Sequence, residues 1–208
     1  MSDIVIASIV EGHGEVEGLP ILLRRIAQER HGVFVRALKP HRVPRAKMVN
    51  RPEELERAVH MQAARVGPAG GVIVLADSDD DDPEALRAQL QTTSDVAAAA
   101  GGAVVVTIAV REYEAWFLAG IESLRVHKAI RDDASYEADP ESPRNPKLKL
   151  EEQMVESYGS VRHQVAFNAT LDLETTERRA PSFRRFLEAV ECLVLGQGTS
   201  LGESRGQD

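Results

Sequence analysis

A dense run of carboxylates follows an apolar segment near the middle of the chain. The residues Val72-Ile-Val-Leu-Ala lead into Asp77, and Ser78 is followed by aspartates at positions 79–82. The β-branched run predicts a buried parallel strand that brings Asp77 and Asp79 to the carboxyl edge of a sheet, where α/β proteins bind ligands. These closely spaced negative charges repel one another unless a cation, a basic partner or water offsets them.

Two other predicted strands also end in acids. Glu11 and Glu15 follow the apolar run at residues 4–10, and Glu114 follows the run at residues 103–110. Because parallel strands place their carboxyl ends along one edge, these groups are expected to converge with Asp77 and Asp79. The chain has one cysteine, so a cysteine-based zinc site is excluded. Carboxylate oxygens suit Mg²⁺ or Mn²⁺, which would clamp phosphate oxygens and activate water.

The same acids also have simpler interpretations. Acidic residues at strand-to-helix turns cap helices or favour helix N-termini through the dipole, and an Asp-rich loop can simply be solvated. We expect solvation for the aspartates at positions 80–82 and metal binding for Glu11 with Asp77 and Asp79. An EF-hand starting at Asp77 is excluded, because Asp82 stands where glycine is required and Ala88 where an acid is required.

The alternation of apolar runs and amphipathic segments predicts an α/β fold. We expect a three-layer, Rossmann-like, mostly parallel sheet with helices on both faces and a C-terminal helical extension. Strands are predicted at residues 4–10, 33–38, 72–77 and 103–110. Helices are predicted at 20–32, 52–66, 83–100, from 111, at 147–158 and from 181. Exposed loops are predicted at 39–47 and 132–146.

These elements predict a core at residues 1–130, with a loop and helical extension at 131–195 packed on it. A Gly/Ser-rich tail at 196–208 is predicted to be disordered. Tyr113 and Trp116 are assigned mainly to the core, and His13 is expected to be a loop histidine in water.

Composition describes an ordinary soluble chain. Its 208 residues are 43% hydrophobic and 28% charged, with a formal net charge of −8. That charge argues against coating DNA non-specifically, although a local basic groove beside an acidic site is compatible with it. The sequence has no run that could span a bilayer and no signal peptide, so we expect a cytoplasmic protein that does not bind membranes.

The motifs resemble the TOPRIM fold family, shared by topoisomerases, bacterial primases and nucleases of the overcoming-lysogenization-defect type. The match consists of a glutamate-glycine loop at residues 10–15 and Asp77-Ser78-Asp79 after a later strand. The chain is still more similar to small uncharacterised bacterial TOPRIM-like proteins, which carry three further features found here. These are Glu114-Ala115-Trp116, Pro146-Lys147 and Pro181-Ser182-Phe183.

The resemblance implies a Mg²⁺- or Mn²⁺-dependent phosphodiester hydrolase that acts in bacterial defence or DNA processing. Glu11 would be a general acid/base or bind the metal, Asp77 and Asp79 would hold it, and Glu15 and Glu114 would be supporting ligands. The alternative is a non-catalytic metal-binding or regulatory partner of an ATPase. Nucleic acid is the other expected partner, and the residues proposed to contact it are Arg42, Arg45, Lys47 and Lys147.

Overall fold

A parallel β-sheet forms the centre of the computed structural model, which describes residues 4–67, 70–98 and 102–196. Its strands are β1 (Ile4–Val10), β2 (Val35–Ala37), β3 (His41–Arg42), β4 (Gly71–Asp77) and β5 (Ala103–Ala109). The order is β2-β1-β4-β5, and the short β3 also pairs with β1 beyond the end of β2. Every pairing is parallel, as expected for strands joined by helical crossovers.

The sheet is buried on both faces, which explains why its strands show no polar alternation. Successive side chains of a strand point to opposite faces, so Ile73 and Leu75 contribute to one hydrophobic cluster, and Val72 and Val74 contribute to the other. Helices cover both clusters. The predicted three-layer α/β fold is therefore confirmed.

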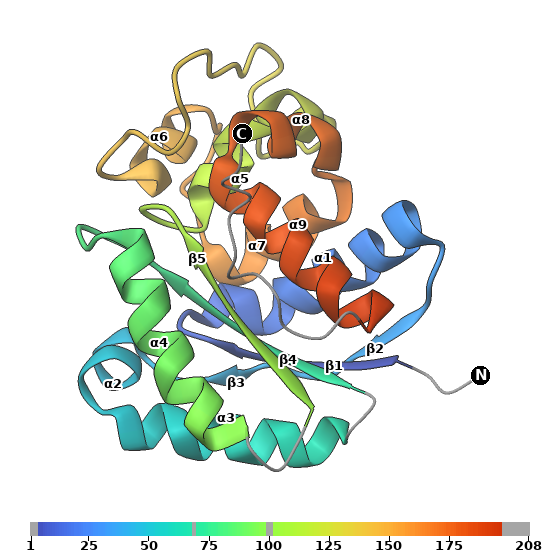
Figure 1. Ribbon diagram of the computed structural model, residues 1–208. Helices are drawn as coiled ribbons and strands as arrows, with labels where there is room; N and C mark the ends of the chain where they lie inside the picture. The colour runs from blue at the N-terminus through green and yellow to red at the C-terminus, as the bar shows by residue number, and fades with distance from the viewer. Residues whose placement is uncertain (1–3, 68–69, 99–101, 197–208) are drawn as a thin grey trace, which may run out of the picture.

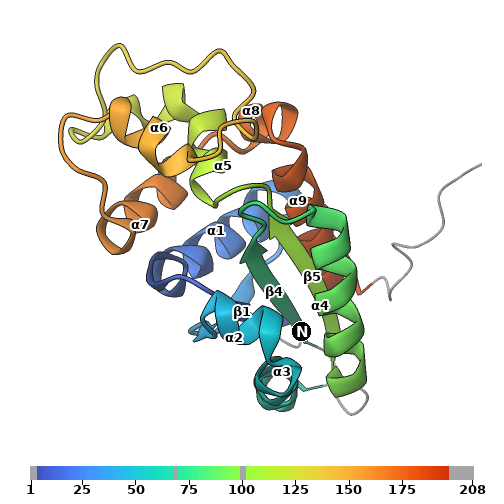
Figure 2. The ribbon, with the colours of Figure 1, turned by 90° about the vertical axis from the view of Figure 1, so that its left-hand side faces the viewer.

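The helices form two unequal layers around the sheet (Figures 1 and 2). One layer consists of α2 (Arg45–Asn50), α3 (Pro52–Val66) and α4 (Pro83–Ala98). The other is built on α1 (His13–His31) and α9 (Pro181–Leu195). Between β5 and α9 the chain forms α5 (Glu114–Ala119), a 3₁₀ helix η1 (Ile121–Val126), α6 (Pro146–Glu152), α7 (Ser160–Thr170) and α8 (Leu173–Arg179).

The helices after β5 share a hydrophobic cluster with α1 and the sheet. Trp116 and Phe117 of α5 are fully buried, and the Trp116 ring contacts Phe183 and Phe186 of α9 at centroid distances of 5.1 and 5.0 Å. The Trp116 indole N–H donates a hydrogen bond to Ser182 Oγ, 2.8 Å away. Tyr113 is also fully buried. Both aromatic residues are therefore core residues, as predicted.

Several predicted boundaries are wrong. Helix α1 begins at His13 instead of near Pro20, which lies inside the helix. A proline within a helix costs about 3 kcal/mol. Burial of Leu19, Leu22, Leu23 and Ile26, each worth roughly 1.5–3 kcal/mol, outweighs that cost.

The segment at residues 39–47 is not simply an exposed loop. It contains β3 and the start of α2; the Val43 N–H donates to Val10 O at 2.9 Å, and Met48 is buried beneath it. The helix predicted at 147–158 ends at Glu152, because the next residues pair with residues 129–131; the Val155 N–H donates to Ala129 O at 2.9 Å. Helices α7 and α8 were not predicted.

No helix in the described ranges has the length and apolar character needed to cross a membrane. The tail predicted to be disordered lies outside the described residues, apart from Gly196.

Candidate functional site

The ends of three adjacent strands bring the predicted acids together. In the register of β1 and β4, Val10 pairs with Leu75, so Glu11 lies beside the last residues of β4. The Glu11 Oε2 atom accepts a long hydrogen bond from the Asp77 backbone N–H at 3.4 Å. In the register of β4 and β5, Asp77 pairs with Ala109, which places Glu114 just beyond the same edge. Glu11, Glu15, Asp77 and Glu114 are called the acidic cluster below.

Glu15 is held in the cluster by the turn that joins β1 to α1. Gly12 is the extended N-cap of α1, and Glu15 lies in the first helical turn with 6% of its surface exposed. A Cβ atom at position 12 would collide with the Glu15 carboxyl group. Glycine at this position therefore allows the Glu15 side chain to fold back over the turn.

The carboxyl groups of the cluster lie within electrostatic range of one another. The pKa of Glu11 is raised to about 6, mainly by burial, and the charges of Asp79 and Glu114 contribute to this rise. Burial raises the pKa of Glu15 to about 7, with added repulsion from Glu114 and Glu11. Burial, followed by the charge of Glu11, raises the pKa of Asp77 well above its ordinary value, and burial also raises that of Glu114. Convergence thus carries an electrostatic cost.

The loop after β4 follows an unusual backbone path. Asp79 and Arg111 both have positive φ angles, 48° and 65°, which are uncommon for residues other than glycine. The two turns are joined: the Asp79 N–H donates to Arg111 O at 2.9 Å, and the Arg111 N–H donates to Ser78 Oγ at 2.8 Å. This coupling holds Asp79 at the rim of the cluster, where 52% of its side chain is exposed.

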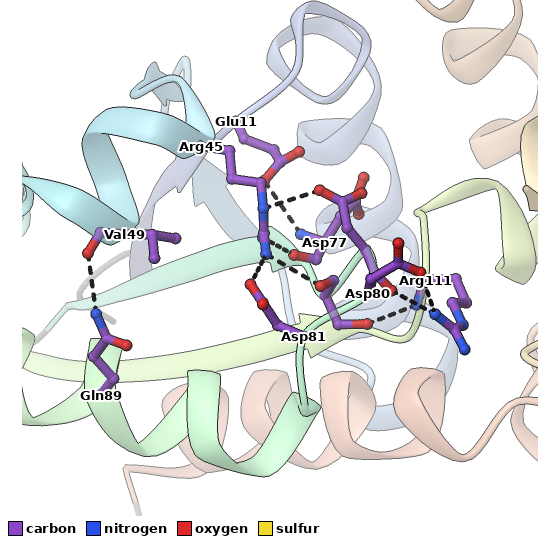
Figure 3. Close-up of polar contacts among 10 residues, drawn as sticks. Glu11, Arg45, Val49, Asp77, Asp80, Asp81, Gln89 and Arg111 are labelled. Atoms are coloured by element: carbon purple, nitrogen blue, oxygen red, sulfur yellow. Dashed lines mark hydrogen bonds and ion pairs between the residues drawn. The ribbon is translucent and has the colours of Figure 1, made fainter. Parts of the chain in front are cut away.

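Arg45 is the basic side chain that contacts the acidic edge most extensively (Figure 3). Its guanidinium donates to the backbone carbonyls of Asp77 and Ser78. It also pairs with Asp79 at 2.9 Å and Asp81 at 2.5 Å, and it lies 3.9 Å from Glu11. The sequence pattern assigned Arg45 to nucleic acid. In the structure it offsets part of the negative charge at the edge.

The outer aspartates are exposed, as predicted, and they also have specific partners. Asp80 pairs with Arg111 at 3.0 Å and Arg144 at 2.5 Å, and the hydrogen bond from Arg144 is the main cause of its lowered pKa. Asp82 Oδ1 accepts the Ala85 N–H at 2.7 Å and so caps the start of α4. Exposure to solvent, ion pairing and helix capping therefore account for Asp80 and Asp82 without a metal ion.

Helix α7 supplies polar groups to the cluster that the sequence did not point to. Gln164 is 1% exposed, and its Nε2 lies 3.5 Å from Glu114 Oε1, at the limit of a hydrogen bond. Asn168 is fully buried and its Oδ1 accepts the Tyr113 hydroxyl at 2.9 Å. Tyr158, just before α7, lies close enough for the Glu114 charge to raise its pKa, after the larger effect of burial. None of these residues belongs to a recognisable motif.

Two glycines of α1 allow α7 to pack this closely. A Cβ at Gly14 would lie 2.5 Å from the Gln164 side chain, and one at Gly18 would lie 2.6 Å from Asn168 Nδ2. Gly14 and Gly18 are four residues apart, as are Gln164 and Asn168, so each pair lies on one face of its helix. The glycines thus accommodate the amide side chains beside Glu15.

We expect Gly18→Ala to destabilise the protein by about 1–3 kcal/mol, the usual cost of overpacking. The new Cβ would also lie 3.2 Å from the Gln164 backbone carbon, which cannot move without shifting α7. Urea unfolding followed by circular dichroism would measure the change. Gly159→Ala is the matched control, since its Cβ would have only His163 Nδ1 nearby, at 4.0 Å. Equal stability of the two variants would contradict this close packing.

The donor set suits a hard cation, although the side chains are not arranged as a complete metal site. Glu15 Oε2, Gln164 Oε1 and Asn168 Nδ2 are buried without hydrogen-bond partners. Buried polar atoms are normally satisfied, so these three atoms could each accept or donate one more hydrogen bond to a polar ligand. Within the described part of the chain, however, no three His, Cys, Asp or Glu side chains are grouped as metal ligands. Binding an ion would require side-chain rotations.

The remaining predicted residues surround the cluster. Arg42 is exposed, and its charge lowers the pKa of Glu15. The charge of Lys147 lowers the pKa of Glu114, and the Lys147 Nζ atom lies 5.9 Å from the centre of the Tyr158 ring. Lys47 is farther from the acids and pairs weakly with Glu54 at 3.9 Å. His13 is exposed, as expected of a histidine in water.

The fold and this edge define a parallel α/β protein with a cluster of buried acids at the carboxyl ends of its strands. The chain belongs to the family described as Domain of unknown function (DUF4276), whose model matches residues 10–191. That match includes the whole acidic cluster. Neither the curated proteins nor the solved structures gave a match.

Proposed function

We propose that the protein is a TOPRIM-like, Mg²⁺- or Mn²⁺-dependent phosphodiester hydrolase acting on nucleic acid, in bacterial defence or DNA processing. The supporting observation is the convergence of four carboxylates at the ends of β1, β4 and β5, at a cost in charge repulsion. A fold gains nothing from such repulsion, whereas a divalent cation would offset it. The TOPRIM relation rests on the sequence motifs.

The proposed roles follow from position. Asp77 and Asp79 would hold the ion with Glu11, and Glu15 and Glu114 would support them from the buried side. When bound, the ion would supply positive charge to phosphate oxygens. Glu11, partly exposed at the edge, would accept a proton from the attacking water. Arg42 and Lys147 border the cluster and would contact the phosphate backbone. Arg45 would have to release Asp79 and Glu11 for the ion to bind there.

We expect the wild type to cleave labelled DNA or RNA only with Mg²⁺ or Mn²⁺, and Glu11→Gln to lower the rate at least about 100-fold. This is the scale of losing a general base. Glu17→Gln is the matched control, because Glu17 is an exposed glutamate of the same region, paired with Lys39 at 3.4 Å. Metal-dependent cleavage that persists in Glu11→Gln would contradict the assigned role.

A second candidate is a non-catalytic metal-binding or regulatory partner of an ATPase. The favouring observation is that the exposed aspartates are already paired within the chain: Asp79 and Asp81 with Arg45, and Asp80 with Arg111 and Arg144. Such an edge can be stable without substrate. Lack of cleavage by the protein alone, with co-elution of a purified ATPase candidate on a sizing column, would favour this function.

A further inference from the structure

A second polar site lies beside α7. A cavity of about 320 Å³ is bordered by the segment after η1, by the residues before α7 and by α7 itself. Its size is at the lower end of the range for small-molecule sites, about 300–1,000 Å³. Gln164 of α7 faces Glu114 of the acidic cluster, whereas Arg162, His163 and Phe167 of the same helix line this cavity. Helix α7 therefore separates two polar sites.

The charge in this cavity is positive. Lys128 and Arg162 line it together with one carboxylate, Glu156. Glu156 is fully engaged, since Arg162 contacts its two oxygens at 3.1 and 3.2 Å and His163 Nε2 lies 3.1 Å from Oε1. Lys128 is exposed, and no carboxylate of the described residues lies within ion-pair distance of it. One positive charge is therefore left over at the cavity.

Hydrogen bonds hold both histidines of the cavity wall in place. The Gly159 N–H donates to His163 Nδ1 at 2.9 Å, so the ring hydrogen lies on Nε2 and points to Glu156. His127 Nε2 lies 2.6 Å from Thr170 Oγ1, and burial lowers the pKa of His127, which favours its neutral form. The His163 ring also stacks on Phe167, with centroids 5.5 Å apart. Both stacked rings are buried, so the apolar surface beside the cationic groups of the cavity comes from Ala129, Val155 and Ala166.

We propose that this cavity binds a small organic anion, with a phosphate or carboxylate against Lys128 and Arg162 and an apolar group against Ala129, Val155 and Ala166. Arg162 can turn part of its guanidinium toward an anion while it keeps one contact with Glu156, because it contacts both Glu156 oxygens. The cavity is larger than an inorganic phosphate needs, which is why we assign an organic ligand. The proposal does not depend on the hydrolase activity.

The test is a titration of ¹⁵N-labelled protein with phenyl phosphate, benzoate and inorganic phosphate, followed by NMR. We expect phenyl phosphate to shift the amides of Lys128, Ala129, Arg162 and His163 saturably at millimolar concentrations. Inorganic phosphate should bind at least about fivefold more weakly, because it leaves the apolar wall uncovered. If benzoate binds as tightly as phenyl phosphate, the cavity is still an anion-binding site, and its ligand is assigned to the carboxylates.

Two lysine variants test whether the probe binds in this cavity. Lys128→Ala should weaken phenyl phosphate binding about tenfold, the scale of one charge-assisted hydrogen bond. Lys39→Ala, another exposed lysine, should leave it unchanged. Lys128 is exposed and forms no ion pair with another described residue, so Lys128→Ala is expected to fold, and the spectrum itself verifies this. The proposal is overturned if no probe shifts these amides, or if Lys128→Ala binds phenyl phosphate as the wild type does.

Discussion

Asp77→Asn is expected to abolish the stabilisation that Mg²⁺ or Mn²⁺ gives the wild type, and at the same time to raise the melting temperature of the metal-free protein. Burial is the main cause of the raised pKa of Asp77, and the charges of Glu11, Glu114, Glu15 and Asp79 raise it as well. The amide keeps the shape of the carboxyl group and removes its charge. At a metal concentration 100 times Kd, binding stabilises by about 2.7 kcal/mol, or roughly 5–10 °C for a chain of this size. In the absence of metal, removal of the repulsion between Asp77 and its acidic neighbours should raise the melting temperature of Asp77→Asn by a few degrees.

Opposite signs in the two conditions make this prediction specific to a charged site. A residue needed only for packing would lower the melting temperature with and without metal. Differential scanning calorimetry measures both effects, and titration calorimetry measures binding directly. Asp95→Asn is the control, because Asp95 is exposed on α4 and accepts only Gln91 Nε2, at 2.7 Å. Failure of the wild type to bind either metal would reject the proposed cofactor.

The central sheet could be predicted because its strands are unusually uniform. Residues 72–76 are apolar throughout and residues 103–109 are β-branched or alanine, and such runs are typical of strands buried on both faces. The start of α1 could not be read in the same way. Pro20 carries a strong local signal for a helix start, but the apolar stripe from Leu19 to Ile26 overrides it through tertiary packing.

The acidic side of the site was predictable for a topological reason. Glu11 and Asp77 directly follow apolar runs and Glu114 comes four residues after one, and parallel strands bring such positions together whatever their separation in sequence. The side of the site formed by α7 could not be predicted, because Gln164 and Asn168 lie 50 and 55 residues along the chain from Glu114 and Tyr113, in a helix of weak amphipathic pattern. The only sign of these two residues in the sequence is their four-residue spacing, which matches that of Gly14 and Gly18. That spacing shows that the two helices contact each other only once their packing is known.

Glu15→Gln is expected to remove much of the pH dependence of stability of the metal-free protein. The folded-state pKa of Glu15 is raised from 4.5 to about 7, mainly by burial, so between these values the folded protein binds more protons than the unfolded chain. Stability must therefore fall as pH rises from about 4.5 to about 7, and the destabilisation is complete above pH 7. The shift corresponds to at most about 3 kcal/mol, or roughly 5–10 °C at pH 8.

The variant should therefore melt at a higher temperature than the wild type at pH 8 and at nearly the same temperature near pH 5, where both side chains are uncharged. A smaller slope should remain, because the pKa of Glu11 is raised to about 6. Glu17→Gln, on the exposed face of α1, should follow the wild-type profile. A wild type that melts highest at pH 8 would show that Glu15 is stabilised as an anion. Arg42 and the α1 N-terminus would then outweigh burial and repulsion, and an ion would no longer be needed to offset the charge of the cluster.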